Sequence, residues 1–430
     1  MVDRCQTGVL NLVPILIIGA SFSVGFSASA LWLGLLVGLT GALFVRDPEL
    51  FVQSVGRIVP IILAFGFMFT YSNIRATEFD PSASPLNILS ALLVIVILRV
   101  QYQRYGQVYF LTGLKQLNAA ILLTALLGVY ETITHRNPLA GIFSYILSEW
   151  KMGTPAYRAS GIFSHPVPFA HMLTTGMVLT LFLVRRLALK IASLGLLIFA
   201  LVGTQTRSAW LVVIFILVVL LILATVQKVF SKYIIYAVIS MPAILALALF
   251  ISGSGKFATY SNGLLTRLGA LSIDDVSVGQ RLGSITAVLN DFFASSDIIE
   301  LLFGHGLASS NDFINRSDIL IENFNTVDNY WLTLLYDFGA IFFVFFVAIT
   351  VAALRVWKLT LRDVQDASSR ALVNCLGLSL LVCLLFMNIY SFTIWRGNQA
   401  LLILCIATLC SITLKSVPQQ RPTVALSQGR

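Results

Sequence analysis

Residues 209–226 read AWLVVIFILVVLLILATV, a stretch without a charged side chain. A bilayer core about 30 Å thick requires roughly 20 apolar residues for a helix that crosses it, and this stretch approaches that length. Similar apolar runs lie at Tyr233–Ile251, Phe342–Leu354 and Leu401–Leu414. The runs are continuous rather than alternating, so they predict membrane-spanning helices and not the strands of a transmembrane barrel.

The composition of the whole chain also fits a lipid environment. Hydrophobic residues make up 58% of the 430 positions and charged residues only 11%, whereas soluble domains carry about 25% charged residues. The net charge of +9 would fit a nucleic-acid-binding protein, but basic residues beside membrane spans contact anionic lipid headgroups. We therefore expect the lipid bilayer, and not nucleic acid, as a partner.

The apolar runs predict an all-α fold, a polytopic membrane helix bundle of about twelve transmembrane helices. The predicted spans are 8–25, 28–45, 58–73, 86–100, 112–130, 163–184, 187–203, 209–227, 233–252, 330–354, 372–392 and 398–414. They divide the chain into helices one to nine at 1–253, a large loop domain at 254–329, helices ten to twelve at 330–414, and a disordered cytoplasmic tail at 415–430.

Lysine and arginine residues set the predicted orientation. With both termini in the cytoplasm, most of the 28 basic residues fall on the cytoplasmic side, including Arg185, Arg186 and the cluster from Arg355 to Arg370. Most of the 19 acidic residues then fall outside, which is the positive-inside pattern.

Two long outer segments follow from this topology, at 131–161 and 252–329. In the second, Gln280–Phe293 predicts an amphipathic helix on the membrane surface or over the bundle, and the glycines of 304–306 predict a helix stop.

The sequence carries no motif for a metal or a cofactor. The five cysteines lie outside the long loop and form no CxxC pair. His165 and His171 are six residues apart, which does not match the i, i+4 spacing of a helical metal site, and His135 and His305 are isolated. GxxxxGK[ST], GxGxxG and GxSxG are absent. We therefore expect neither a metal nor a cofactor.

Two arginines at the outer ends of predicted spans are candidates for anion binding, because charges there are costly in lipid and usually face a cavity. Arg207 lies in the short turn Thr204–Trp210 among hydroxyl and amide groups, and a guanidinium group binds phosphate oxygens in pairs. Arg281 opens the predicted loop helix, and helix N-termini also bind anions. The alternatives are an arginine that snorkels to the interface and an arginine that is simply solvated.

Two further candidates would act on protons. Asp328 directly precedes the tenth predicted span, where it is either a general base for a sugar hydroxyl or a helix N-cap. His165 lies at the entrance of the sixth predicted span, where it either shuttles protons and binds substrate or is a hydrogen-bonded structural residue.

Four segments, taken in order, resemble the O-antigen ligase and polymerase superfamily of bacterial envelope glycan assembly. They are RASGIFSHP at Arg158–Pro166, TQTRSAW at Thr204–Trp210, GQRLGS leading to LLFGHG within Gly279–Gly306, and VDNYWLTLLYDFG at Val327–Gly339. The long outer loop between the ninth and tenth predicted spans also fits that superfamily.

The resemblance implies a GT-C-like, metal-independent, inverting glycosyltransferase of the bacterial inner membrane that acts on the periplasmic side. Its implied donor is a glycan linked to undecaprenyl diphosphate, its acceptor a glycan or lipid A–core, and a chain-length regulator is a further implied partner. Arg207 and Arg281 would hold the diphosphate, and Asp328 would act on the acceptor hydroxyl. The approach would be lined by Arg158, His165, Glu322, Asn329, Tyr330 and Trp331.

One departure from the ligase pattern bears on the reaction. The ligase branch has a histidine before the asparagine that here is Asn329, whereas this chain has Asp328. An Asp-Asn pair at this place is common among exopolysaccharide and O-antigen polymerases. The resemblance therefore favours a polymerase, with a ligase as the alternative. A lipid-linked glycan transporter or flippase is a third hypothesis, but transporter sites usually lie near the bilayer midplane in repeated halves, and here the charges gather at the outer rim.

Overall fold

The computed structural model describes residues 11–21, 26–56, 86–139, 157–163, 165–227, 276–317, 327–363, 367–390 and 396–413, with single positions between 59 and 71. All regular secondary structure in these ranges is helical, which confirms the all-α fold. The helices are α1 (Leu12–Ser21), α2 (Phe26–Arg46), α3 (Pro48–Gly56), α5 (Leu86–Thr134), α6 (Pro166–Leu183), α7 (Leu187–Thr204), α8 (Arg207–Gln227), α11 (Val276–Ala294), α12 (Ile298–Phe303), α13 (Ser309–Arg316), α14 (Tyr330–Asp363), α15 (Ala367–Phe386) and α16 (Arg396–Thr413).

Several helices have the length and composition of membrane spans. Within the described residues, five qualify, at Leu92–Thr134, Pro166–Leu183, Leu187–Thr204, Tyr330–Leu361 and Ser368–Phe386. Shorter apolar helices cover Trp32–Arg46, Arg207–Leu223 and Asn398–Cys410. The chain is therefore a polytopic helical membrane protein. The predicted third span at 58–73 lies mostly outside the described residues and the ninth at 233–252 wholly so, and the number of twelve spans stays a prediction.

The structure joins two predicted spans in one helical run. We predicted separate spans at 86–100 and 112–130, but α5 continues through the intervening residues and is broken only at Gly106 (φ 69°, ψ −159°). Glycine adopts this backbone conformation without steric penalty, so the chain changes direction there without a loop. The start of α1 is tied to this bend: the Asn11 side-chain amide donates to the Tyr109 carbonyl (2.7 Å), and the Leu12 N–H donates to the Tyr109 hydroxyl (2.8 Å).

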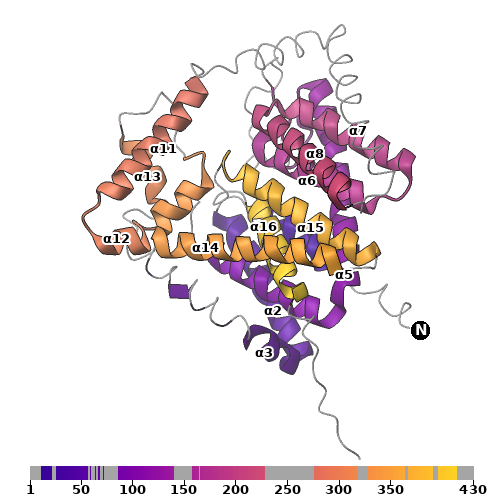
Figure 1. Cartoon of the computed structure of the whole chain (residues 1–430), viewed down its shortest axis with the longest axis horizontal. Helices are drawn as coiled ribbons and strands as arrows, with labels where there is room; N and C mark the ends of the chain where they lie inside the picture. The colour runs from indigo at the N-terminus through magenta and orange to yellow at the C-terminus, as the bar shows by residue number, and fades with distance from the viewer. Residues whose placement is uncertain are drawn as a thin grey trace, which may run out of the picture.

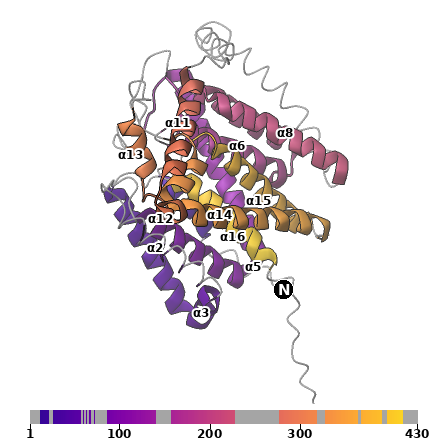
Figure 2. The same cartoon turned by 60° about the vertical axis from the view of Figure 1, so that its left-hand side comes forward.

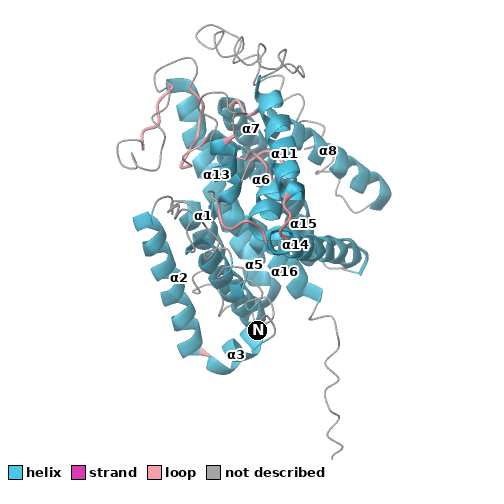
Figure 3. Ribbon diagram, turned by 90° about the vertical axis from the view of Figure 1, so that its left-hand side faces the viewer, coloured by secondary structure: helices cyan, strands magenta, loops and turns pink. Residues whose placement is uncertain are grey.

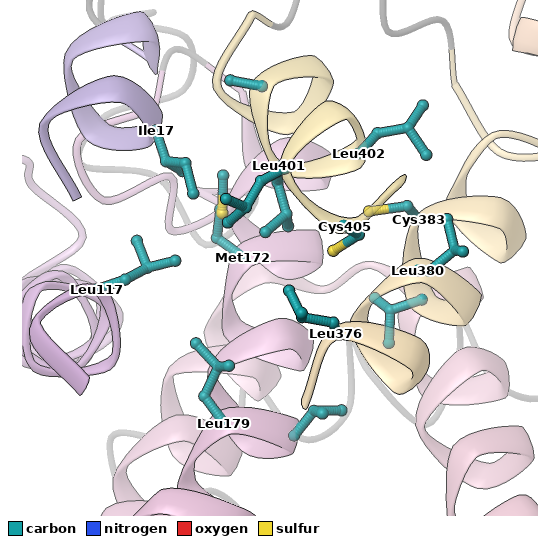
Figure 4. Close-up of a cluster of buried hydrophobic side chains, with 14 of the residues drawn as sticks. Ile17, Leu117, Met172, Leu179, Leu376, Leu380, Cys383, Leu401, Leu402 and Cys405 are labelled. Carbon is teal, nitrogen blue, oxygen red and sulfur yellow. The ribbon is translucent and has the colours of Figure 1, made fainter. Parts of the chain in front are cut away.

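The core of the bundle is built from α1, α5, α6, α15 and α16. Figure 4 shows Ile17, Leu117, Met172, Leu376 and Cys405 from these five helices in one buried cluster. Such packing holds transmembrane helices together by close van der Waals contact, because lipid tails are as apolar as the side chains. The cluster fixes the helices whose ends carry the candidate site.

One end of the bundle collects the candidate residues, and we call it the site end. It comprises the starts of α6, α8, α14 and α16 and the ends of α5, α7 and α15. The Tyr330 N–H donates to the Met387 carbonyl (2.7 Å), which joins the start of α14 to the end of α15. The Asn398 side-chain amide of α16 donates to the Pro168 carbonyl of α6 (3.4 Å).

The opposite end is rich in basic side chains. The Ser369 hydroxyl, near the start of α15, donates to the Gln107 side chain beside the bend in α5 (2.5 Å). Arg185 and Arg186 form the turn from α6 to α7 and are exposed, and Arg370 lies next to Ser369. This distribution fits the predicted orientation, which itself stays a prediction.

Helices α11, α12 and α13 represent the predicted loop domain at 254–329. They stand on one side of the bundle in Figure 1, with α6, α7 and α8 on the other, and Figures 2 and 3 bring α11 and α13 forward. Helix α11 contains the predicted helix Gln280–Phe293 and begins four residues earlier, at Val276. Helix α12 ends at Gly304, as its glycine predicts.

A buried carboxylate ties this helical unit to α14. Asp337 is 1% exposed and accepts the backbone N–H groups of Ala308 (3.0 Å) and Ser310 (2.9 Å). A carboxylate that accepts such bonds in a buried position is stabilised by them, whereas an unpaired one would be strongly unfavourable. The link therefore holds the segment before α13 firmly against α14.

Two glycines make a second link between α12 and α14. Gly339 breaks α14 (φ 78°), and near this break the Tyr336 carbonyl accepts the His305 N–H (2.9 Å). Gly304 lies so close to Gly339 and to the Asp337 carbonyl that a Cβ at either glycine would collide with the opposite backbone. Glycine is needed at both positions for the approach and for the positive φ.

Candidate functional site

A tight turn between α7 and α8 places Arg207. Gln205 ends α7 in the left-handed conformation (φ 49°), and Arg207 is the first residue of α8. Gly203 packs so closely on Thr132 of α5 that no side chain fits between them. The turn thus has little freedom, and the half-buried Arg207 side chain starts from a fixed backbone.

Arg158 is bound to the same turn. Its Nε donates to the Thr204 carbonyl (2.8 Å) and its Nη2 donates to the Thr206 hydroxyl (3.0 Å). The Ala159 N–H also donates to a carbonyl of the turn, that of Gly203 (2.9 Å). We call residues 157–160 and 203–207 the arginine turn. Its two guanidinium groups and its hydroxyls are a donor set that suits phosphate oxygens.

A second buried carboxylate supports the arginine turn. Glu131, near the end of α5, is 0% exposed and accepts the Tyr157 hydroxyl (2.6 Å), the Ser160 N–H (2.9 Å) and the Asn137 side-chain amide (3.2 Å). These bonds fix the chain on both sides of Arg158. Glu131 is the first residue of the predicted outer segment 131–161, and an acidic residue at the end of an apolar span is itself a signal of a fixed or functional position.

His165 is the N-cap of α6. Its backbone is extended (φ −144°), and its Nδ1 accepts the Val167 N–H (3.3 Å). The surrounding protein and the nearby Arg158 charge both lower the pKa of His165, so the ring is neutral at neutral pH although part of it reaches solvent. A neutral capping imidazole agrees with the structural alternative.

Arg281 lies on the inward-facing stripe of α11. Ile285, Val288 and Phe292 follow it at helical spacing and pack with α13 and α14. Residues at these intervals share one face of a helix. Leu282 is 53% exposed and lies off this face. The register of α11 therefore directs Arg281 toward the start of α14.

Asp328 meets Arg281 there. The Arg281 Nη2 lies 3.5 Å from the Asp328 Oδ2, and the two side chains are 36% and 26% exposed. A partly exposed ion pair at this distance contributes little to stability, about 0–1 kcal/mol. The two groups are therefore held near one another by the packing of α11 on α14, and the ion pair itself is free to open.

The helix-cap alternative for Asp328 is wrong, because the next residue caps α14. The Asn329 side-chain oxygen accepts the N–H groups of Trp331 (3.0 Å) and Leu332 (3.2 Å). Asn329 thus satisfies donors that helix starts leave open. The Asp328 carboxylate is turned to Arg281 instead.

The two aromatic candidates point into the protein to different extents. Tyr330 is 6% exposed, so it is a packing residue first. The Trp331 ring is half-buried and packs edge-on against Phe343 and Phe346 of α14, with ring centroids 6.2 and 5.7 Å away. Only Trp331 keeps surface for a sugar ring. Glu322, the remaining candidate, lies outside the described residues.

A buried polar cluster connects the two halves of the site end. The His171 Nδ1 of α6 lies 2.7 Å from the Tyr390 hydroxyl and 2.8 Å from the Asn398 side-chain amide, which also contacts that hydroxyl. Because the Tyr330 N–H donates to the Met387 carbonyl and the Tyr390 hydroxyl contacts His171, residues 387–390 join the start of α14 to α6. The arginine turn and the Arg281–Asp328 pair therefore belong to one end of the bundle.

The candidate site has few side chains of the types that bind metal ions. In the described part of the chain, no three His, Cys, Asp or Glu residues gather where they could hold a metal ion. The arginine turn is instead suited to an anion. Metal-free chemistry stays a prediction.

The fold and the site define a multi-pass helical membrane protein with a cationic polar site at one end of its bundle. The family model described as O-antigen ligase matches residues 192–347, a range that contains Arg207, Arg281 and Asp328. This segment is similar to that family, which supports the expected relationship to the O-antigen ligase and polymerase superfamily. No curated protein matches the chain.

Proposed function

We propose that the protein polymerises glycan repeat units carried on undecaprenyl diphosphate, at the periplasmic face of the bacterial inner membrane. The Arg281–Asp328 pair carries this proposal. It sets a cation for a diphosphate leaving group beside a carboxylate that can take a proton, at the same bundle end as Arg158 and Arg207.

The proposed reaction is a direct displacement. The acceptor hydroxyl oxygen attacks the anomeric carbon of the donor sugar, and the bond from that carbon to the diphosphate oxygen breaks with inversion. The diphosphate leaves with the electron pair, and the hydroxyl proton passes to Asp328. Arg207 and Arg281 offset the negative charge that grows on the diphosphate in the transition state, so that a metal ion is not needed.

Because the ion pair is weak, we expect donor binding to come before proton transfer to Asp328. A diphosphate carries more negative charge than one carboxylate and competes with Asp328 for Arg281. Because the pair is 3.5 Å long and partly exposed, little free energy opposes its opening. Donor binding then frees the Asp328 carboxylate for the acceptor hydroxyl, which couples the base to an occupied donor site.

A ligase is the second candidate, and the description of the matching family model favours it. The displacement is the same, but the acceptor is lipid A–core. Asp328 before Asn329 is the reason to place the polymerase first. A deletion strain separates the two: loss of a polymerase leaves single repeat units on the acceptor, whereas loss of a ligase leaves polymer on its lipid carrier.

The direct test uses the full chain, purified and reconstituted in bilayer discs with a diphosphate-linked repeat unit and a metal chelator. We expect a ladder of elongated glycans from the wild type and none from Arg281→Ala. Arg316→Ala is the matched control, because Arg316 is an exposed arginine on neighbouring α13, and it should give the wild-type ladder.

Three outcomes would contradict parts of the proposal. A normal ladder from Arg281→Ala removes the diphosphate role of that residue. Elongation that stops with the chelator and returns with a divalent cation removes the metal-free mechanism. Uptake of the lipid-linked glycan into liposomes without any elongation replaces the enzyme with the transporter hypothesis.

A further inference from the structure

Helix α12 exposes apolar side chains and turns its one acidic side chain toward the protein. Ile298, Ile299 and Leu302 are 67%, 47% and 38% exposed. Its acidic residue, Glu300, is turned to the protein, where it accepts the Ser295 hydroxyl (2.8 Å) and lies 3.6 Å from the His305 Nε2. In water, charged side chains are the ones that stay outside. Charges that face the protein and apolar groups that face outward are typical of a surface in contact with lipid.

One side of α12 contacts a segment that the sequence predicts to be in the membrane. The Phe303 ring packs against Phe67 and Tyr71, with ring centroids 5.6 and 5.3 Å away. Both partners fall within the predicted third span at 58–73. Phe67 is itself 56% exposed, so exposed apolar surface continues from α12 onto this residue.

The other side of α12 contacts a span that the structure describes. Gly304, which caps α12, meets the break in α14 at Gly339, and Figure 1 shows α12 beside the first part of α14. Just beyond the break, Ile341 and Val344 are 46% and 63% exposed on α14. They lie within the span Tyr330–Leu361. The outward apolar residues of α12 therefore continue the exposed apolar surface of a candidate membrane span.

We propose that α12 is an interfacial anchor that inserts Ile298, Ile299 and Leu302 among the acyl chains of the leaflet at the site end. Phe293, at the end of α11 and 70% exposed, joins this anchor. The occupant of the patch is the bilayer and not a partner protein, because α12 contacts a candidate span, α14, and residues of a predicted one, and its charged residue is already satisfied inside the chain.

The anchor has a consequence for the site. Phe293 and Arg281 lie on one helix, α11, and at 1.5 Å per residue they are roughly 18 Å apart along its axis. Fixing one end of α11 in the leaflet sets the depth at which the other end presents Arg281. This inference concerns the seating of α11 in the bilayer and holds whether the acceptor is a glycan or lipid A–core.

The test places a nitroxide label at Ile298, Ile299 or Leu302, one at a time, in the full chain with its cysteines replaced, reconstituted in liposomes. Collision with oxygen, which concentrates in lipid, is compared with collision with a water-soluble nickel chelate. The control label is at Asn315, which is exposed on α13. We expect the oxygen-to-nickel ratio at the three α12 sites to be severalfold higher than at Asn315.

Equal ratios at α12 and at Asn315 would overturn the proposal, and would leave α12 as a water-facing patch that docks a protein. If the cysteine-replaced chain does not fold, the same contrast is measured on Ile299→Trp and Asn315→Trp in the native background. Brominated acyl chains should then quench the added fluorescence of the first and not of the second, and absence of that difference overturns the proposal equally.

Discussion

The arginine turn and the Arg281–Asp328 pair hold their charged groups in different ways. Arg158 gives two hydrogen bonds to the backbone and hydroxyl of a turn, and buried Glu131 fixes the chain on both sides of it. Arg281 and Asp328 instead come from two separate elements and meet in one long, partly exposed ion pair.

The arginine turn is therefore a prepared half of the site, in which Arg158 is already held by hydrogen bonds. The Arg281–Asp328 pair is an adjustable half, because its ion pair can open. Donors that are fixed before substrate arrives need no reorganisation during reaction, which is the most effective form of electrostatic stabilisation. An ion pair that opens readily can exchange one partner for a ligand. We infer that the arginine turn receives the diphosphate, while the Arg281–Asp328 pair responds to it. Four measurements test this division.

The largest effect is expected from Arg207→Ala. Loss of the cation that we infer at the leaving group should lower kcat about 1000-fold, as for other preorganised charge-stabilising groups. Arg207→Lys should recover little, because an ammonium group cannot bind two phosphate oxygens side by side. Glycan elongation by purified protein is the measurement, with equal protein folding checked by thermal unfolding. Activity of the lysine variant near the wild-type level would show that charge alone is sufficient.

Asp328→Asn is expected to separate catalysis from binding. Loss of the base should lower kcat about 100-fold, while the donor should bind more tightly because the diphosphate no longer competes with a carboxylate for Arg281. Elongation assays give kcat, and titration with a non-reactive diphosphate lipid gives Kd. Weaker donor binding in this variant would contradict the adjustable role of the ion pair.

Gly304→Ala should loosen the helical unit that carries Arg281. A Cβ there would collide with the backbone of Asp337 and Gly339, and the positive φ adds strain, so we expect a loss of about 2–4 kcal/mol in the free energy of unfolding. Thermal or denaturant unfolding measures it. Gly279→Ala on α11 is the matched control, because its Cβ would meet open space. Equal stability of the two variants would show that the contact between α12 and α14 is not tight.

The smallest effect is expected from Glu131. Glu131→Ala removes the acceptor for the Tyr157 hydroxyl and the Ser160 N–H, and loosened positioning of Arg158 should raise the KM for the donor about tenfold with kcat less affected. Glu131→Gln keeps one oxygen for the Ser160 N–H and should recover most of the affinity. If both variants lose only stability, with KM unchanged, Glu131 has no part in positioning Arg158.

Some parts of the site could be predicted from the sequence because they depend on local order. The turn at 203–207 is short and lies between two apolar runs, so Arg207 had to lie at a span end. The helical spacing of Ile285, Val288 and Phe292 predicts which face of α11 packs inward, and Gly304 predicts where α12 ends. Asn329 and Asp328 show the limit of such reasoning: two neighbouring residues both suit a helix cap, and only the backbone path decides which one fills it.

The sequence by itself determined that the chain lies in a lipid bilayer. Its apolar runs are long enough to cross a bilayer, and its charges lie between those runs. Tertiary structure alone decided which charges meet. Glu131 and Ser160 are 29 residues apart in the chain, and Arg281 and Asp328 are 47 residues apart. The sequence around each residue does not predict which partner it contacts. Hydrophobicity is a property of each residue and needs no geometry, whereas an ion pair or a buried hydrogen bond depends on how helices pack and where glycines bend them.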